Sequence, residues 1–224
     1  MNLRSLASGI GSLSDDTRRE LYEYVVGRGE PVSREEAATA TGLRPHKANF
    51  HLDRLVEEGL LEVEYRRLTG RTGPGAGRPS KLYRRSRQEF ALSLPPRRYD
   101  LVGDILAASV TRASAGEPLD AALQDSARDH GIEAGQAAPH DDPASIEDLT
   151  SALAGQGYEP GEEDGVLELH NCPFDTLADR HRALVCGLNE SYVQGVADGM
   201  GCARADARLE PGDGRCCVRV HRRE

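Results

Sequence analysis

The sequence predicts a mixed α+β fold whose two halves differ in charge. Residues 1–98 carry 18 Lys and Arg against 13 Asp and Glu, a balance of +5, whereas the rest of the chain carries 10 against 24, a balance of −14. Segments with helical periodicity alternate with short segments of strand-like alternation in both halves. We expect three parts in 224 residues: a domain at 1–94, a helical linker or dimerisation segment at 95–143, and a domain with an antiparallel sheet at 144–224.

Two short helices are predicted in the first domain. Ser33 and Glu36 have the spacing of a capping box, which begins a helix that Gly42 ends, since glycine readily adopts the left-handed conformation. Pro45 occupies a first-turn position where proline is tolerated. The second helix, ending near Glu58, carries a periodic apolar face. That face consists of Ala48, Leu52, Leu55 and Val56.

A basic β-hairpin is predicted after the two helices. Leu61, Val63 and Tyr65 alternate with charged residues, as in a half-buried strand, and Lys81–Arg84 supplies a return strand. Two helices followed by a hairpin form a winged helix-turn-helix, whose second helix can enter the major groove of DNA. The alternative is a solvated basic hairpin on an ordinary helical protein.

The charge of this region favours double-stranded promoter DNA as the partner. Residues 43–98 contain 13 Lys and Arg against 6 Asp and Glu, and such a cluster binds phosphates by releasing counterions. The candidate DNA-binding residues are Arg44, His46, Lys47, Phe50 and Arg54 on the helix and Arg71, Arg78 and Lys81 on the hairpin.

Two strings in this region resemble known regulators. The segment 51–60, HLDRLVEEGL, is similar to winged-helix domains of ArsR-like and MarR-like regulators. The segment 77–84, GRPSKLYR, resembles the wing of the group that includes the SufR-type repressors. The resemblance implies a transcription regulator.

The segments around this domain have weaker patterns. Residues 1–12 are predicted to be a loose arm, followed by a support helix from Ser14. After the first domain an apolar stripe recurs at helical spacing, and it predicts either the seam of a homodimer or a contact with the chain's own core. Residues 131–143, rich in Gly, Ala, Pro and Asp, are predicted to form a mobile loop. The stripe consists of Tyr99, Val102, Ile105, Leu106, Val110 and Ala113.

The last third is predicted to contain a capped helix from Ser145, a strand at 166–169, a mainly helical segment at 176–200, and two final strands at 203–209 and 216–220. All five cysteines fall between residues 172 and 217. Thiolates are the ligands of zinc and iron–sulfur sites, but buried cysteines also act as small apolar residues. In the final strand, Cys216 shares a face with valines and Cys217 shares one with charged residues.

The cysteine pattern resembles the C-terminal four-cysteine pattern of the SufR-type repressors. The matching strings are Asn171-Cys172-Pro173, Leu184-Val185-Cys186-Gly187, Cys202, and Gly214-Arg215-Cys216. The resemblance implies an iron–sulfur cluster on Cys172, Cys186, Cys202 and Cys216, with Cys217 as an extra thiol. Two alternatives remain. The first is a zinc site on these cysteines. In the second, the cysteines only fill a core and the domain senses a small molecule or protein.

Other classes of protein fit the sequence poorly. No apolar run is long enough to cross a membrane and the N-terminus lacks a secretory pattern, so we expect a cytoplasmic protein without a membrane partner. No phosphate-binding loop, nucleophile elbow or HExxH motif occurs, so we do not expect an enzyme.

Overall fold

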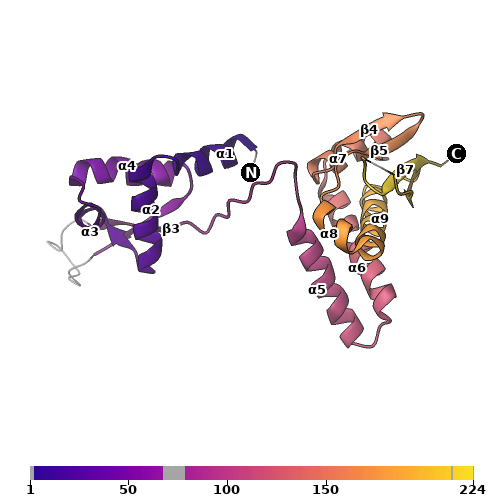
Figure 1. The fold of residues 1–224 in the computed structure, drawn as a ribbon, viewed down its shortest axis with the longest axis horizontal. Coiled ribbons are helices and arrows are strands. Elements are labelled where there is room, and N and C mark those ends of the chain that lie inside the picture. The colour runs from indigo at the N-terminus through magenta and orange to yellow at the C-terminus, as the bar shows by residue number, and fades with distance from the viewer. Residues whose placement is uncertain (1–2, 68–78, 213, 224) are drawn as a thin grey trace. The chain divides into compact units, whose positions relative to one another are not determined.

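The structure is a computed structural model that describes residues 3–67, 79–212 and 214–223. The chain divides into two compact units, Met1–Leu92 and Ser93–Glu224, called here the N-terminal and C-terminal units. Each unit combines helices with an antiparallel sheet, which confirms the predicted α+β class (Figure 1).

The N-terminal unit has the order of a winged helix-turn-helix. Its sheet has the strand order β1-β3-β2 with antiparallel pairing, and Val63 lies opposite Tyr83. The elements are α1 (Leu3–Ser12), α2 (Asp16–Arg28), β1 (Val32–Ser33), α3 (Arg34–Ala40), α4 (Pro45–Glu57), β2 (Leu61–Arg66) and β3 (Ser80–Arg85).

Local interactions explain where α3 and α4 form. The Ser33 hydroxyl accepts a hydrogen bond from the Glu36 amide at 3.2 Å, and the Glu36 carboxylate accepts one from the Ser33 amide at 2.8 Å. This is the predicted capping box. Ala48, Leu52 and Leu55 of α4 are fully buried, as the periodicity predicted, so the opposite face of α4 is left toward solvent.

The prediction of a loose arm at residues 1–12 is wrong, because α1 occupies most of that segment. Gly9 of α1 is buried, and a Cβ there would lie 2.3 Å from Cε1 of Phe90. The missing side chain therefore lets α1 pack against the segment that follows β3. The composition of the arm hid this helix, since its glycines and serines resemble those of a loop.

The C-terminal unit places helices beside a four-stranded antiparallel sheet of order β4-β5-β7-β6 (Figure 1). None of the helices in the described ranges is long and apolar enough to cross a membrane. The elements are α5 (Tyr99–Ser114), α6 (Leu119–Ala137), α7 (Ile146–Gly155), β4 (Pro160–Glu163), β5 (Val166–Leu169), α8 (Asp175–Arg180), α9 (Arg182–Gly199), β6 (Ala205–Leu209) and β7 (Val218–Arg222).

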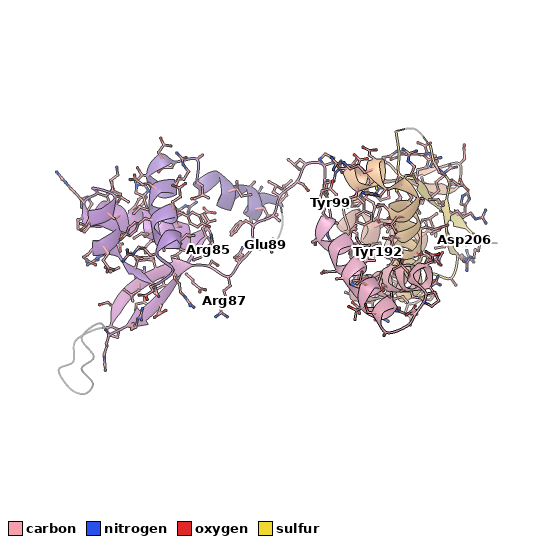
Figure 2. The ribbon with its side chains drawn as sticks, turned by 60° about the horizontal axis from the view of Figure 1, so that its bottom comes forward. Arg85, Arg87, Glu89, Tyr99, Tyr192 and Asp206 are labelled. Atoms are coloured by element: carbon pink, nitrogen blue, oxygen red, sulfur yellow. The ribbon has the colours of Figure 1, made fainter. Side chains whose placement is uncertain are left out.

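The loop predicted at 131–143 is wrong in its first half, which belongs to α6. There α6 packs on α9 with their backbones in close approach. A Cβ on Gly131 would lie 2.2 Å from the carbonyl oxygen of Tyr192, which sits among the helices of the unit (Figure 2), and a Cβ on Gly195 would lie 2.3 Å from that of Arg128. Gly131 therefore serves helix packing and not a loop, and Gly195 serves the same contact from α9.

The apolar stripe on α5 is divided between two environments. Val102 and Ile105 are buried in the core of the C-terminal unit, which agrees with the core alternative for these two residues. Tyr99 and Val110 are 41% and 60% exposed, so they remain available for a contact between subunits. The homodimer stays a prediction.

The final strand begins later than predicted. β7 starts at Val218, so Cys216 and Cys217 lie in the segment that leads into it. The amide of Cys216 nevertheless donates to the carbonyl oxygen of Leu169 at 2.8 Å, which continues the pairing toward the end of β5. Cys216 is buried and Cys217 half-buried, in the alternation predicted for the two faces.

Candidate DNA-binding surface and cysteine cluster

The exposed face of α4 carries the predicted DNA-contacting residues. His46, Lys47, Phe50 and Arg54 are all exposed, and Phe50 is 66% accessible. Arg44 precedes the helix, is exposed, and makes no side-chain capping bond. This set can contact base edges through donors and an aromatic ring, as a helix in the major groove requires.

Two of the predicted cationic contacts are already paired with carboxylates. Arg54 lies 3.1 Å from Glu57 and 2.5 Å from Glu58, both on or next to α4. Lys81 of β3 places its Nζ 2.5 Å from Oδ1 of Asp53. Contact with DNA phosphates or bases therefore competes with ion pairs inside the unit.

Asp53 is the centre of a network that ties α4 to the wing. Besides the ammonium of Lys81, it accepts hydrogen bonds from the Tyr83 hydroxyl at 2.7 Å and from Nδ2 of Asn49 at 2.9 Å. Burial raises the pKa of Asp53, but these donors outweigh burial and hold the pKa below its ordinary value. Burial and the nearby Asp53 raise the pKa of Tyr83. Sequence reasoning missed Asn49 and Asp53, although their four-residue spacing on one helix face was visible.

The described part of the wing is also paired internally. Arg66 lies 3.2 Å from Glu64, and Arg84 lies 2.8 Å from Glu62. The predicted contacts Arg71 and Arg78 lie outside the described residues.

Four of the five cysteines lie together in the C-terminal unit, and all are free thiols. Cys172 follows β5, Cys186 lies in the second turn of α9, and Cys216 and Cys217 precede β7. The thiol of Cys172 lies next to that of Cys216, and the thiol of Cys186 lies next to that of Cys217. Three segments that are distant in sequence thus meet as two thiol pairs.

Cys202 lies apart from this cluster, which differs from the set predicted by resemblance. Its buried Sγ donates to the carbonyl oxygen of Ser145 at 3.6 Å, at the start of α7. Cys186 lies near the beginning of α9 and Cys202 lies beyond its end. At about 1.5 Å of rise per residue the helix separates them by roughly 20 Å. Cys217, the extra thiol, is the cysteine that the structure brings to the other three.

A buried polar chain leads to Cys216. Nδ2 of Asn189 donates to Sγ of Cys216 at 3.0 Å, and Oδ1 of Asn189 accepts from the hydroxyl of Tyr158 at 2.5 Å. The neighbouring thiol of Cys172 and burial raise the pKa of Cys216, while the thiol of Cys216 lowers the pKa of Cys172. Burial raises the pKa of Cys186 to about 12. Cys172, Cys186 and Cys216 are therefore chemically unequal.

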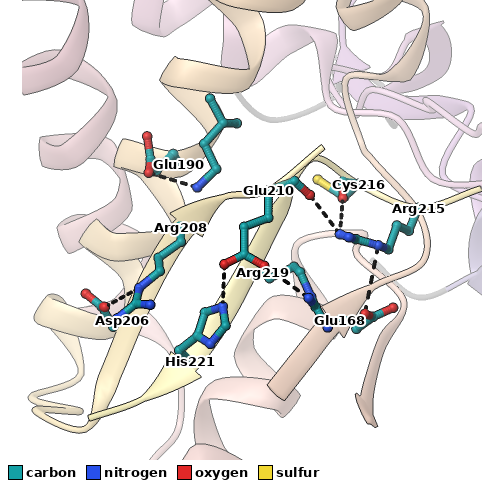
Figure 3. Close-up of polar contacts among 10 residues, drawn as sticks. Glu168, Glu190, Asp206, Arg208, Glu210, Arg215, Cys216, Arg219 and His221 are labelled. Carbon is teal, nitrogen blue, oxygen red and sulfur yellow. Dashed lines mark hydrogen bonds and ion pairs between the residues drawn. The ribbon is translucent and has the colours of Figure 1, made fainter. Parts of the chain in front are cut away.

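Ion pairs and hydrogen bonds fix the turn that carries Cys216 (Figure 3). The buried carboxylate of Glu168 lies 2.6 Å from Arg219 and 3.8 Å from Arg215. Arg215 donates to the carbonyl oxygens of Glu210 at 2.9 Å and Cys216 at 3.4 Å. The segment between β6 and β7 is thereby held against the neighbouring strand β5.

A half-open pocket of about 490 Å³ lies over Cys172. Its lining includes Asp179 and Arg182, from α8 and the start of α9, and Arg215 from the turn before β7. Within the described residues, no three His, Cys, Asp or Glu side chains converge as ligands of one metal ion. The four-cysteine cluster therefore consists of two adjacent pairs and not of a preformed tetrahedral site.

Comparison with known proteins gives one match. Residues 13–64 match a family described as a helix-turn-helix domain. No curated protein and no solved structure matches the chain. The match confirms the predicted helix-turn-helix and indicates a DNA-binding transcription regulator.

Proposed function

We propose that this protein is a transcription regulator, acting as a repressor in the cytoplasm, whose affinity for promoter DNA is controlled by an iron–sulfur cluster on its C-terminal cysteines. The observation that carries the proposal is the occurrence of two pairs of free thiols, drawn from three separate segments, in the unit that does not contain the helix-turn-helix. Membership in the SufR-type group is part of the proposal.

DNA binding is assigned to α4 and the wing. The exposed face of α4 enters the major groove, with Arg54 and Lys47 donating to bases or phosphates and Phe50 contacting a thymine methyl group. A single winged helix covers a short half-site, so a homodimer doubles the contact. Tyr99 and Val110 are exposed residues of the apolar stripe on α5 that are available to such a dimer.

The donor set suits an iron–sulfur cluster. It consists of Cys172, Cys186, Cys216 and Cys217, with Cys217 in place of Cys202. Cysteine thiolates are the usual ligands of iron–sulfur clusters, so these four residues would hold the cluster. When bound, the cluster supplies an electron-accepting centre that oxidants can destroy. The protein's own contribution includes the N–H of Asn189, which orients the sulfur of Cys216.

Control of DNA affinity follows from what these thiols connect. They lie after β5, within α9 and before β7, so loss of their common ligand frees three elements of one unit. Coupling between two sites typically amounts to about 1–3 kcal/mol, or roughly 5–150-fold in affinity. We expect promoter binding to change within this range between the loaded and empty forms.

Single Cys→Ser variants test the ligand set. Iron, sulfide and visible absorption are measured on anaerobically purified protein, and promoter binding is measured before and after oxidation. Cys186→Ser and Cys217→Ser are expected to lose the cluster, whereas Cys202→Ser, the matched control, keeps it. Full iron content in both Cys186→Ser and Cys172→Ser would contradict a cluster held by these cysteines. One equivalent of zinc without visible absorption would replace it by a zinc site.

Substitution of Arg54 tests the reading helix. Arg54→Ala is expected to weaken promoter binding by about 1–3 kcal/mol if the guanidinium makes a bidentate base contact. Fluorescence anisotropy with promoter and random duplexes measures this cost, and Arg28→Ala, an exposed arginine on α2, is the control. Unchanged binding by both Arg54→Ala and Lys47→Ala would mean that α4 does not read the DNA.

A further inference from the structure

The pocket over Cys172 gives this thiol an environment different from that of the other cysteines. Cys172 is half-buried and lines the pocket of about 490 Å³, whereas Cys186, Cys202 and Cys216 are buried at 3–4% exposure. Cys217 is also half-buried but is not part of the pocket lining. Solutes can therefore reach Cys172 through the pocket.

Directly behind Cys172 lies a second thiol held in place. The amide of Cys216 donates to the carbonyl oxygen of Leu169 at 2.8 Å, which places Cys216 beside the segment that carries Cys172. The Sγ of Cys216 accepts the N–H of Asn189 at 3.0 Å. Asn189 is 1% exposed and is itself fixed by the hydroxyl of Tyr158, which is 3% exposed. An accessible thiol in contact with a buried, oriented thiol is the arrangement of a thiol–disulfide exchange pair.

The walls of the pocket carry both signs of charge. Asp179 and Arg182 line it, and neither makes an ion pair within the described part of the chain. Arg215 adds a second guanidinium to the lining. A molecule with both an ammonium and a carboxylate group, carried close to a sulfur, matches this lining.

We propose that, in the metal-free protein, Cys172 and Cys216 form an exchange-active dithiol that a zwitterionic low-molecular-weight disulfide oxidises from the pocket. The proposed function involves neither a small disulfide as ligand nor a disulfide between these two cysteines. The inference concerns the protein without a cluster, so it can be tested independently of the proposed iron–sulfur function.

The chemistry balances in two steps. The sulfur of Cys172 gives up its proton, attacks one sulfur of the bound disulfide, and releases the other half as a thiol that takes up a proton. The sulfur of Cys216 then attacks the mixed disulfide on Cys172 and releases the second half as a thiol in the same way. The small disulfide is reduced to two thiols, and the cysteine pair is oxidised to one protein disulfide.

The test uses full-length protein, stripped of metal with a chelator and reduced, then mixed with cystine. Exchange is followed by quenching with an alkylating agent and by mass spectrometry of the intact chain and its peptides. Wild type and Cys202→Ser are expected to lose two hydrogens and to yield a peptide cross-linked between Cys172 and Cys216. Cys216→Ser is expected to stop at one half-cystine attached to Cys172.

Charge variants test the pocket. Arg182→Ala and Asp179→Ala are each expected to slow exchange with cystine about fivefold, the size of one exposed ion pair. They leave exchange with the uncharged 2-hydroxyethyl disulfide unchanged. Arg180→Ala, an exposed arginine of α8 outside the pocket lining, is the control and reacts like wild type.

Three results would overturn the inference. The first is a protein disulfide between Cys216 and Cys217 in the wild type. The second is an adduct in the Cys216→Ser variant on a cysteine other than Cys172. The third is equal slowing of both small disulfides by the charge variants. Iron and sulfide binding are measured separately, so a protein that exchanges but holds no iron refutes only the cluster.

Discussion

The close contact between α6 and α9 makes a quantitative prediction about stability. Gly195→Ala puts a methyl group 2.3 Å from the carbonyl oxygen of Arg128, where ordinary contact begins at about 3.4 Å. Both partners are helix backbone, so the helices must separate by roughly 1 Å. Overpacking of this kind costs about 3 kcal/mol, at the upper end of its usual range. Alanine recovers about 1 kcal/mol of helix propensity, which leaves a net loss of about 2 kcal/mol.

Gly187→Ala is the matched control, because it lies in the same helix and a Cβ there meets nothing within 4 Å. It is expected to stabilise the C-terminal unit by about 1 kcal/mol. For a unit of this size we expect a melting temperature about 7 °C lower for Gly195→Ala and about 3–4 °C higher for Gly187→Ala. Differential scanning calorimetry of the full chain measures both, with the transition of the N-terminal unit as an internal reference. A Gly195→Ala protein that melts at or above wild type would refute the packing argument.

Three further predictions concern the DNA-binding unit and assembly. Neutralising Arg71 and Arg78 is expected to weaken promoter and random DNA equally and to lower the slope of log affinity against log salt by about 0.9 per lost phosphate contact; loss on one sequence alone would indicate base reading by the wing. Asp53→Asn is expected to destabilise the N-terminal unit at neutral pH. Since the folded pKa of Asp53 is depressed, its stabilisation is present above the ordinary pKa of 3.8 and disappears as pH falls through the folded value, so urea titrations of wild type and variant should converge in acid. Sedimentation is expected to show a dimer, and a monomer with and without DNA would reject the homodimer.

The N-terminal unit was predictable because its signals are local. The Ser33 and Glu36 capping box, the spacing of the α4 core residues and the alternation in β2 each lie within a few residues of one another. The charged network on Asp53 was not predictable in this way, because Lys81 lies 28 residues away. The position of Lys81 depends on how the hairpin packs against α4.

The cysteine cluster shows where sequence spacing stops being informative. Similar gaps between cysteines suggested equal roles, but Cys186 and Cys202 are separated by nearly the whole length of α9. A helix long enough to keep them apart was itself part of the prediction. The same holds for Gly131, whose surroundings have the composition of a loop although its missing side chain serves the contact between α6 and α9.

The ion pairs on the DNA-binding face have a consequence for selectivity. The carboxylates of Asp53, Glu57 and Glu58 compete with DNA phosphates for the side chains of Lys81 and Arg54. When the protein binds random DNA, Lys81 and Arg54 exchange a carboxylate partner for a phosphate. This exchange contributes little binding free energy. A cognate sequence adds base contacts, which make binding favourable despite the loss of the ion pairs. The carboxylates of the unit thus lower its affinity for random DNA. Specificity therefore comes from this lower non-specific affinity as much as from a higher affinity for the cognate sequence.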